Sequence, residues 1–131
     1  MFLAPLIRFP ASGHSLRNVS RGTVLASRVE TAFDSAARRK GLLGRESLDR
    51  GSVLVIAPCN AIHTFFMRFA IDVAFATRDG RIVKMLDALR PWRVGVAWRA
   101  YAVLEFPPGT LARTGTQRGD ELALVENQDD A

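Results

Sequence analysis

The sequence of 131 residues contains only one cysteine, which excludes an intramolecular disulfide. It has no apolar run approaching the roughly 20 residues that cross a bilayer as a helix, so we expect no membrane span. It also lacks a phosphate-binding loop, a dinucleotide-binding fingerprint and the HExxH zinc motif, so we expect no cofactor. The fold must therefore rest on packing, which a single domain of this length can supply.

Positive charge is unevenly distributed along the chain. The formal net charge is +5, and residues 1–29 carry four of these charges, because four arginines precede the first acid, Glu30. The basic residues that follow are spread out and mostly offset by acids. Because a nucleic acid needs a basic patch on its protein partner, we expect no nucleic-acid partner.

The two ends of the chain differ in composition from the middle. Residues 1–22 contain prolines and glycines without a sustained period, and we expect a poorly ordered basic leader in loop conformation. This segment lacks the basic start and apolar core of a secretory signal, which favours a cytoplasmic location, with the periplasm as the alternative. Residues 23–126 are expected to form one domain and residues 127–131 an acidic tail.

Strand patterns dominate the expected domain. Alternating or continuous apolar residues predict strands at Thr23–Val29, Ser52–Ala57, Ile62–Met67, Ile71–Thr77, Arg81–Asp87, Tyr101–Phe106 and Glu121–Val125. The Asp79-Gly80 pair is a strong hairpin signal, so the two strands that flank it should pair antiparallel.

Helix signals are fewer. They predict a helix that is capped by Thr31 and ends at Gly41, a short helix at Ser47–Arg50 and a helical turn at Leu111–Gly115. Residues 94–99 are expected to form a loop. Together these elements predict an α+β fold with a mainly antiparallel, curled, barrel-like sheet of about six or seven strands and one or two short helices.

The segment from Pro58 to Phe75 has the densest mixture of polar and large apolar side chains. A buried polar group without a partner costs roughly 1–3 kcal/mol, so the polar residues here need partners. The segment is therefore either a structural hydrogen-bond network or a ligand site.

Three residues of this segment could bind a soft metal. Cys59, His63 and Met67 are spaced four apart, which places them on one stripe of a helix or on one face of a strand. Thiolate, imidazole and thioether suit cuprous copper. The alternative is that these residues fill the core, where lone cysteines and methionines are common.

A small hydrolase is a second hypothesis for the same segment. His63 could act with Cys59 or with Asp72, since a catalytic thiol needs a base and a group that orients it. However, no glycine-rich oxyanion hole or nucleophile elbow accompanies Cys59.

Two acids lie in strands that are otherwise apolar. Asp72 and Glu105 each need a cation or backbone donors if they are buried, and Arg68 and Arg90 are the candidate cations. Trp92 could wall a ligand pocket, or it could equally plug the end of a barrel. We therefore expect a non-enzymatic module that binds a small polar or anionic ligand. The candidate ligand-binding residues are His63, Thr64, Arg68, Asp72, Trp92 and Glu105.

Several motifs together are similar to a known family. They are GLLGR at 41–45, CNAIHTFFMRFAIDVAF at 59–75, DGRIVKM at 79–85, RPW at 90–92, VLEFPPGT at 103–110 and GDEL at 119–122. In this order and spacing the chain resembles domain-of-unknown-function family 192 of bacteria and archaea. The resemblance implies a compact α+β domain but does not imply a biochemical activity. Many members of the family have an export signal before this domain.

The resemblance also points to particular residues. The family motif falls on Cys59, His63, Thr64, Met67, Asp72, Asp79, Gly80, Glu105, Gly109, Gly119 and Asp120. Turn geometry alone accounts for the glycines and Asp79. Other branches of the family lack the cysteine and the histidine, which implies that Met67, a basic residue at 68 and Asp72 are the better candidates for a shared site.

Overall fold

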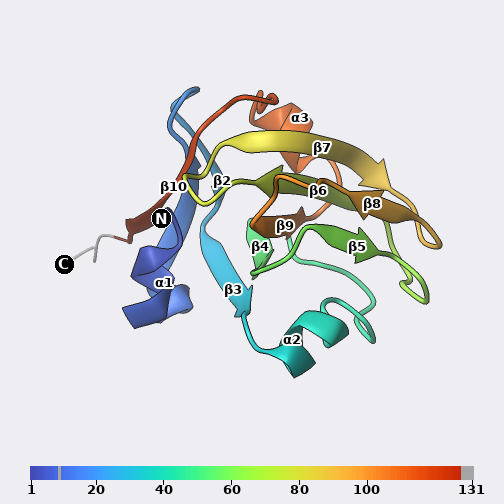
Figure 1. The fold of residues 1–131 in the computed structure, drawn as a ribbon. Coiled ribbons are helices and arrows are strands. Elements are labelled where there is room, and N and C mark those ends of the chain that lie inside the picture. Colours follow the sequence, from blue (N-terminus) through green and yellow to red (C-terminus); the bar gives the residue numbers. More distant parts are fainter. Residues whose placement is uncertain (9, 128–131) are drawn as a thin grey trace.

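The structure is a computed structural model that describes residues 1–8 and 10–127. Its helices are short: α1 (Ala4–Arg8), the 3-10 turn η1 (Ala11–Gly13), α2 (Ser35–Lys40) and α3 (Thr110–Arg113). Its strands are β1 (His14–Asn18), β2 (Thr23–Ala26), β3 (Arg28–Ala32), β4 (Ser52–Ile56), β5 (Ala61–His63), β6 (Ile71–Ala76), β7 (Ile82–Leu89), β8 (Val94–Val96), β9 (Ala102–Phe106) and β10 (Leu122–Glu126). The predicted α+β class is confirmed, with strands making up most of the regular structure (Figure 1).

The strands form three sheets. The largest has the order β3-β4-β9-β6-β7, a second has the order β10-β1-β2, and β5 and β8 form a two-stranded ribbon. Neighbouring strands are antiparallel except β3 and β4, which are parallel. The expected single curled, barrel-like sheet is not confirmed, because the described strands divide over three sheets and close no barrel.

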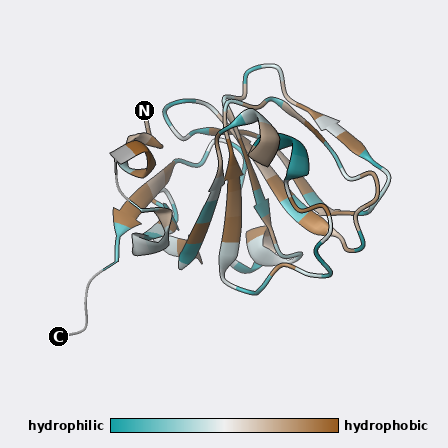
Figure 2. Ribbon diagram, turned by 90° about the horizontal axis from the view of Figure 1, so that it is seen from below, coloured by the Kyte–Doolittle hydropathy of each residue, from teal (hydrophilic) through white to brown (hydrophobic). Residues whose placement is uncertain are grey.

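The central strands β4, β9 and β6 are buried along their whole length. Because side chains alternate between the two faces of a strand, these strands, which are apolar except for Ser52, Asp72 and Glu105, supply two cores, one on each side of the sheet. Val53 and Val55 of β4 belong to the first core, and Leu54 and Ile56 belong to the second. Figure 2 shows hydrophobic residues on several strands in the middle of the molecule.

The N-terminal segment contributes to the first core. Leu16 of β1 is fully buried, and β1 lies between β10 and β2. The side-chain amide of Asn18 donates to Asp120 at 2.9 Å, which ties β1 to the turn before β10. The expectation of loop over this segment is therefore wrong at α1, at η1 and at the strand β1. One partner of β1, β2, is close in the chain, and the other, β10, is about a hundred residues away. The division at residue 22 stays a prediction, and the predicted acidic tail lies, except for Asn127, outside the described residues.

The predicted hairpin of β6 and β7 is confirmed, with Asp79-Gly80 in its turn. Gly80 has a φ of +86°, and a Cβ added to it would lie 2.5 Å from the carbonyl oxygen of Leu122. The turn therefore requires glycine both for its backbone conformation and for its close approach to β10.

Two local predictions before β4 need correction. The expected strand Thr23–Val29 is divided at Ser27, where the backbone N–H groups of Ser27 and Arg28 both donate to the carbonyl of Gly51. Thr31 belongs to β3 and pairs with Val55, so it does not cap the helix. The carboxylate of Asp34 caps α2 instead, because it accepts from the N–H of Ala37 at 2.8 Å.

Three further predictions differ from the structure. The expected strand Ile62–Met67 ends at His63, because a turn with Phe66 at a φ of 66° follows. Residues 94–99 are not wholly loop, since β8 pairs there with β5. The expected short helix at Ser47–Arg50 does not form. No described helix combines the length and apolar character that crossing a membrane would require.

Candidate functional site

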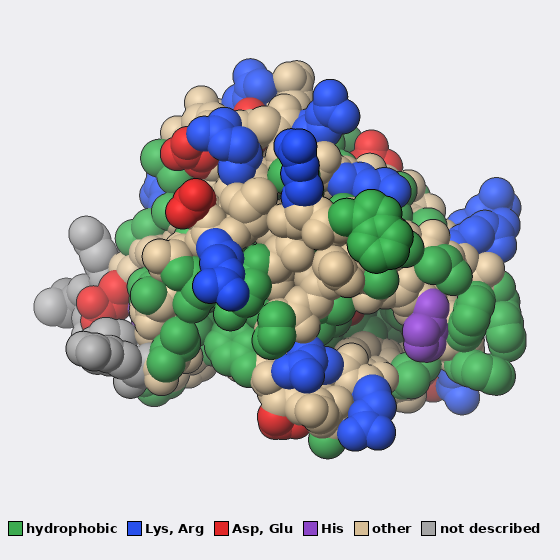
Figure 3. Space-filling view, in the orientation of Figure 1, with side chains coloured by type: hydrophobic (Ala, Val, Ile, Leu, Met, Phe, Trp, Pro, Cys, Tyr) green, Lys and Arg blue, Asp and Glu red, His purple; other side chains and the backbone are tan. Residues whose placement is uncertain are grey.

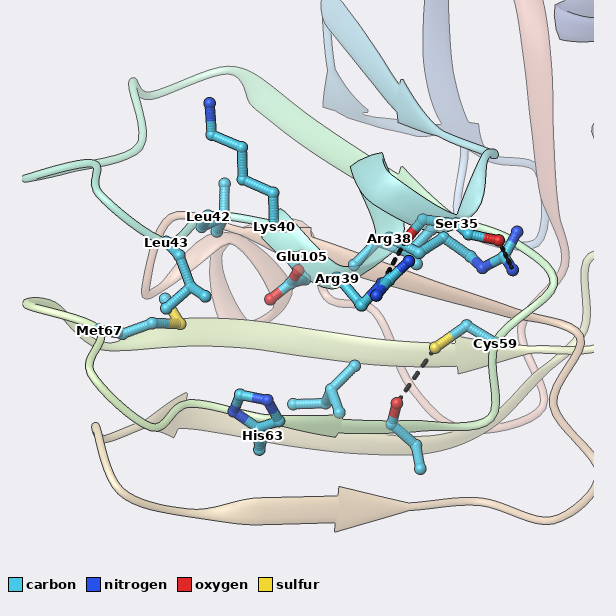
Figure 4. A pocket seen from close by; sticks show the side chains of 14 residues that line it. Ser35, Arg38, Arg39, Lys40, Leu42, Leu43, Cys59, His63, Met67 and Glu105 are labelled. Atoms are coloured by element: carbon cyan, nitrogen blue, oxygen red, sulfur yellow. Dashed lines mark hydrogen bonds between the residues drawn. The ribbon is translucent and has the colours of Figure 1, made fainter.

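A hollow of about 500 Å³ lies between α2 and the β5–β8 ribbon (Figure 4). It opens on the face of the large sheet that carries the second core. The residues that line it are Ser35, Arg38, Arg39, Lys40, Gly41, Leu42, Leu43, Ile56, Cys59, Ala61, Ile62, His63, Met67 and Glu105.

Helix α2 supplies the cationic edge of the hollow. Arg38, Arg39 and Lys40 occupy its last turn, where positive charge is favoured by the helix dipole. Arg38 donates to the carbonyl of Phe33 at 2.6 Å, so part of its guanidinium is occupied by the start of its own helix. Gly41 then ends the helix with a φ of +47°.

Glu105 is the acid of the hollow. It lies in β9, where it pairs with Leu54 of β4 and Val73 of β6, and only 4% of its surface is exposed. Figure 4 shows its carboxyl group pointing into the space between α2 and Met67. Among the described residues, every side-chain nitrogen or oxygen that is fully enclosed has a hydrogen-bond partner. The carboxyl group of Glu105 forms no hydrogen bond or salt bridge with a described residue, so its oxygens are not fully enclosed. Its carboxyl oxygens must therefore open into the hollow.

Burial sets the charge state of this carboxyl group. It raises the pKa of Glu105 to about 7, and the positive charge of Arg45 opposes this rise only in part. Near neutral pH, Glu105 therefore exists as a mixture of acid and carboxylate, and it can either donate to a ligand or accept from one.

Cys59, His63 and Met67 line the opposite side of the hollow. The thiol of Cys59 donates to the carbonyl of Ala61 at 3.1 Å, and burial raises its pKa above the ordinary value. His63 stacks on Phe65 with ring centroids 4.9 Å apart, and its Nδ1 accepts from the N–H of Phe65. The structure brings these three residues to one hollow, but Cys59 and His63 form no hydrogen bond with each other.

The other predicted site residues lie outside this lining. Thr64 is fully buried, and its hydroxyl donates to the carbonyl of Arg90 at 2.7 Å. Trp92 is 57% exposed on the neighbouring turn. Arg68 points to solvent and pairs with Glu46 at 3.6 Å.

Asp72 has no cationic partner among the described residues. Its two oxygens accept from the backbone N–H groups of Ala88 at 2.8 Å and Leu111 at 2.9 Å. Of the two kinds of partner expected for a buried acid, Asp72 has backbone donors. The candidate cations Arg68 and Arg90 form no described ion pair with Asp72 or Glu105. Asp72 holds β6, β7 and α3 together.

The residues of α2 were not among those predicted from the sequence to form a site. The available signal was the position of the basic turn directly before the GLLGR motif at 41–45. Only the fold shows that this motif faces Glu105.

The lining offers few ligands for a metal. No group of three histidine, cysteine or acidic side chains comes together among residues 1–8 and 10–127. A metal in the hollow would therefore depend on the thioether of Met67 as its third ligand.

Comparisons with known proteins place the chain. It is 32% identical over 111 residues to a UPF0127 protein of Pyrococcus furiosus, a match covering 80% of this chain and 93% of that one. A protein of unknown function from Novosphingobium aromaticivorans has a similar crystal structure, with a TM-score of 0.71 and 26% identity over 87% of this chain and 89% of that one. A Sinorhizobium meliloti structure described as a putative transcription regulator shares the fold, with a TM-score of 0.72 and 24% identity over 83% of this chain and 89% of that one.

The family assignment rests on most of the chain. The model of DUF192, described as an uncharacterised ACR, matches residues 16–124, which include every residue that lines the hollow. The chain belongs to the DUF192 family.

Proposed function

We propose that the protein is a non-enzymatic module that binds a small ligand in the hollow between α2 and the β5–β8 ribbon. The observation that carries this proposal is Glu105, a buried carboxyl group that faces open space without a described partner. A buried polar group of this kind is costly, and a ligand with an N–H or O–H donor would supply the missing hydrogen bond.

The cationic edge indicates a second feature of the ligand. Arg39 and Lys40 line the hollow, and neither forms an ion pair with another described residue. An acidic group on the ligand would be stabilised by these two side chains. The favoured ligand therefore carries both an acidic group and a hydrogen-bond donor.

The remaining walls accept an apolar portion. Leu43, Ile62 and Met67 contribute aliphatic and thioether surface opposite the charged groups. A volume of about 500 Å³ lies in the range of pockets that enclose small molecules. Of the residues predicted from the sequence to bind a ligand, His63 and Glu105 belong to this proposal.

Thermal-shift screening of small metabolites tests the proposal. A bound compound at about a hundredfold excess over its Kd should raise the Tm of the wild type by roughly 10 °C. Glu105→Gln and Arg39→Ala should lose most of this shift. Arg113→Ala is the matched control, since Arg113 also lies in the last turn of a short helix but outside the hollow.

Two results would reject ligand binding here. One is that no compound carrying both an acid and a donor stabilises the wild type. The other is a shift that persists unchanged in both Glu105→Gln and Arg39→Ala.

Cuprous copper is a second candidate ligand. Cys59, His63 and Met67 line the same hollow and form a soft ligand set, although the raised pKa of Cys59 means that binding must displace a proton. Equilibrium dialysis with copper(I) should show reduced uptake by Met67→Leu and His63→Gln. Equal uptake by the wild type and both variants would exclude these ligands.

The structure gives no comparable support to the hydrolase hypothesis, because both oxygens of Asp72 accept hydrogen bonds from backbone N–H groups.

A further inference from the structure

A cluster of exposed aromatic side chains lies at one end of the β5–β8 ribbon, outside the hollow. Phe65, Phe66 and Trp92 form it, and we name these three residues the aromatic tip. The ring of Trp92 lies 5.7 Å from that of Phe65 and 4.8 Å from that of Phe66. Phe66 is 72% exposed and Trp92 is 57% exposed, so these rings contact one another while facing solvent.

The backbone under the aromatic tip is held in an unfavourable conformation. Phe66 and Trp92 both have a φ of 66°, a left-handed value that disfavours large side chains. Thr64 fixes the two turns together, because its hydroxyl accepts from the N–H of Arg93 at 2.9 Å and its carbonyl accepts from the N–H of Trp92. The strained backbone at Phe66 and Trp92 places their rings in solvent and not in the core. This arrangement indicates that the rings contact a partner at the protein surface.

Basic residues predominate beside the aromatic tip. Arg68, Arg90 and Arg93 lie within two residues of its members, and all three are exposed. Residues 59–71 and 88–101, which carry the tip, contain no acid. The only described ion pair here joins Arg68 to Glu46, whose side chains are 69% and 85% exposed.

The turns that carry the tip project from one end of the molecule. Figure 1 shows the turn after β5 and the turn before β8 extending beyond the sheets. In Figure 3 hydrophobic side chains gather at this margin beside the visible histidine, with Lys or Arg side chains near them. Since the rings protrude, they would enter a soft surface more readily than fill a partner's groove.

We propose that the aromatic tip docks the protein onto an anionic lipid surface. Tryptophan and phenylalanine are favoured at the boundary between headgroups and acyl chains, where an apolar ring is buried and its polar edge stays wet. The flanking arginines complement lipid phosphates, and basic residues beside anionic bilayers add to binding. This activity is separate from the proposed ligand in the hollow.

Vesicle flotation with the full chain tests the docking. Vesicles of equimolar phosphatidylcholine and phosphatidylglycerol should carry the protein, and vesicles of phosphatidylcholine alone should carry much less. The double variant Phe66→Asn and Trp92→Asn removes both rings while asparagine tolerates the left-handed backbone. Its partition onto anionic vesicles should fall at least about tenfold.

Trp98 provides the matched control. It is 85% exposed, yet it follows β8 at the opposite end of the ribbon from Trp92. Trp98→Asn should therefore leave flotation unchanged. Because the chain has two tryptophans, Trp98→Phe leaves Trp92 as the only one, and its fluorescence should shift to the blue on anionic vesicles. Trp92→Phe should show no such shift.

Three results would overturn lipid docking. The first is that the wild type does not float with anionic vesicles, and the second is that the double variant floats as well as the wild type. The third is that Trp98 reports the fluorescence shift and Trp92 does not. If the wild type does not float with vesicles but binds oligodeoxythymidylate, and the double variant does not bind it, the partner of the aromatic tip is single-stranded nucleic acid instead.

Discussion

Asp72 and Glu105 lie on neighbouring strands but on opposite faces of the five-stranded sheet. In the pairing of β6 with β9, Glu105 is opposite Val73, and Asp72 is opposite Phe106. Val73 belongs to the second core and Phe106 to the first, and directly paired residues share a face. The two acids therefore cannot act on one ligand, and each has a separate task.

The task of Asp72 is structural, so Asp72→Ala should lower the free energy of unfolding by about 2–4 kcal/mol, because two backbone N–H groups lose their acceptor. Urea denaturation measures this change. Arg68→Ala is the control, and its exposed pair with Glu46 should contribute less than about 0.5 kcal/mol. A loss below about 1 kcal/mol in Asp72→Ala would contradict the assigned role.

The task of Glu105 should appear in the pH dependence of stability. Its pKa rises from 4.5 to about 7 on folding, so the folded state keeps a proton that the unfolded state has released. The contribution of Glu105 to stability is therefore greatest below about pH 4.5 and is lost as the pH rises through about 7, a change of about 3 kcal/mol in total.

Glu105→Gln should remove this contribution. Between about pH 4.5 and about pH 8, the wild type should lose about 3 kcal/mol of unfolding free energy relative to Glu105→Gln. Urea denaturation at both values measures it. A difference that stays constant with pH would show that Glu105 keeps an ordinary pKa when folded.

The contrast between these acids shows what the sequence could predict about the site. Burial of both acids follows from their apolar neighbours in β6 and β9. Their opposite faces do not, because the face depends on the register between two strands that are far apart in the chain. The cationic edge at Arg39 was missed for the same reason, since only the packing of α2 over the sheet brings it to Glu105.

The fold shows the same dependence on distance along the chain. The β6–β7 hairpin and the strands β4 and β9 were predictable, because a local turn signal or an apolar run specifies each of them. The strand β1 was not, because one of its two neighbours, β10, comes from the other end of the sequence, although the other, β2, follows it closely. In the ribbon, β5 was predicted only in part, within a longer strand, and β8 was not predicted, because three residues are too few for a pattern to show.

The left-handed backbone of the aromatic tip should carry a stability cost. Phe66→Asn should raise the free energy of unfolding by about 0.5–1 kcal/mol, because asparagine tolerates this conformation and little ring burial is lost. Trp98→Asn should give no gain, since Trp98 has no positive φ. Chemical denaturation of both variants checks this, and a destabilised Phe66→Asn would mean that the ring supports the fold.

Cys59 should report the charge of Glu105. Burial raises the pKa of the Cys59 thiol, and the nearby negative charge of Glu105 raises it further, so alkylation by iodoacetamide should be slow at neutral pH. Glu105→Gln removes that charge and should accelerate alkylation at about pH 8, where the wild-type carboxyl is ionised. At about pH 5.5 the two proteins should react alike, because Glu105 is then mostly protonated.

Asp79→Asn, in the exposed hairpin turn, is the control and should leave the alkylation rate unchanged at both pH values. Fast alkylation of the wild type near neutral pH would contradict the raised pKa. It would show that the Cys59 thiol is activated, as a catalytic nucleophile requires.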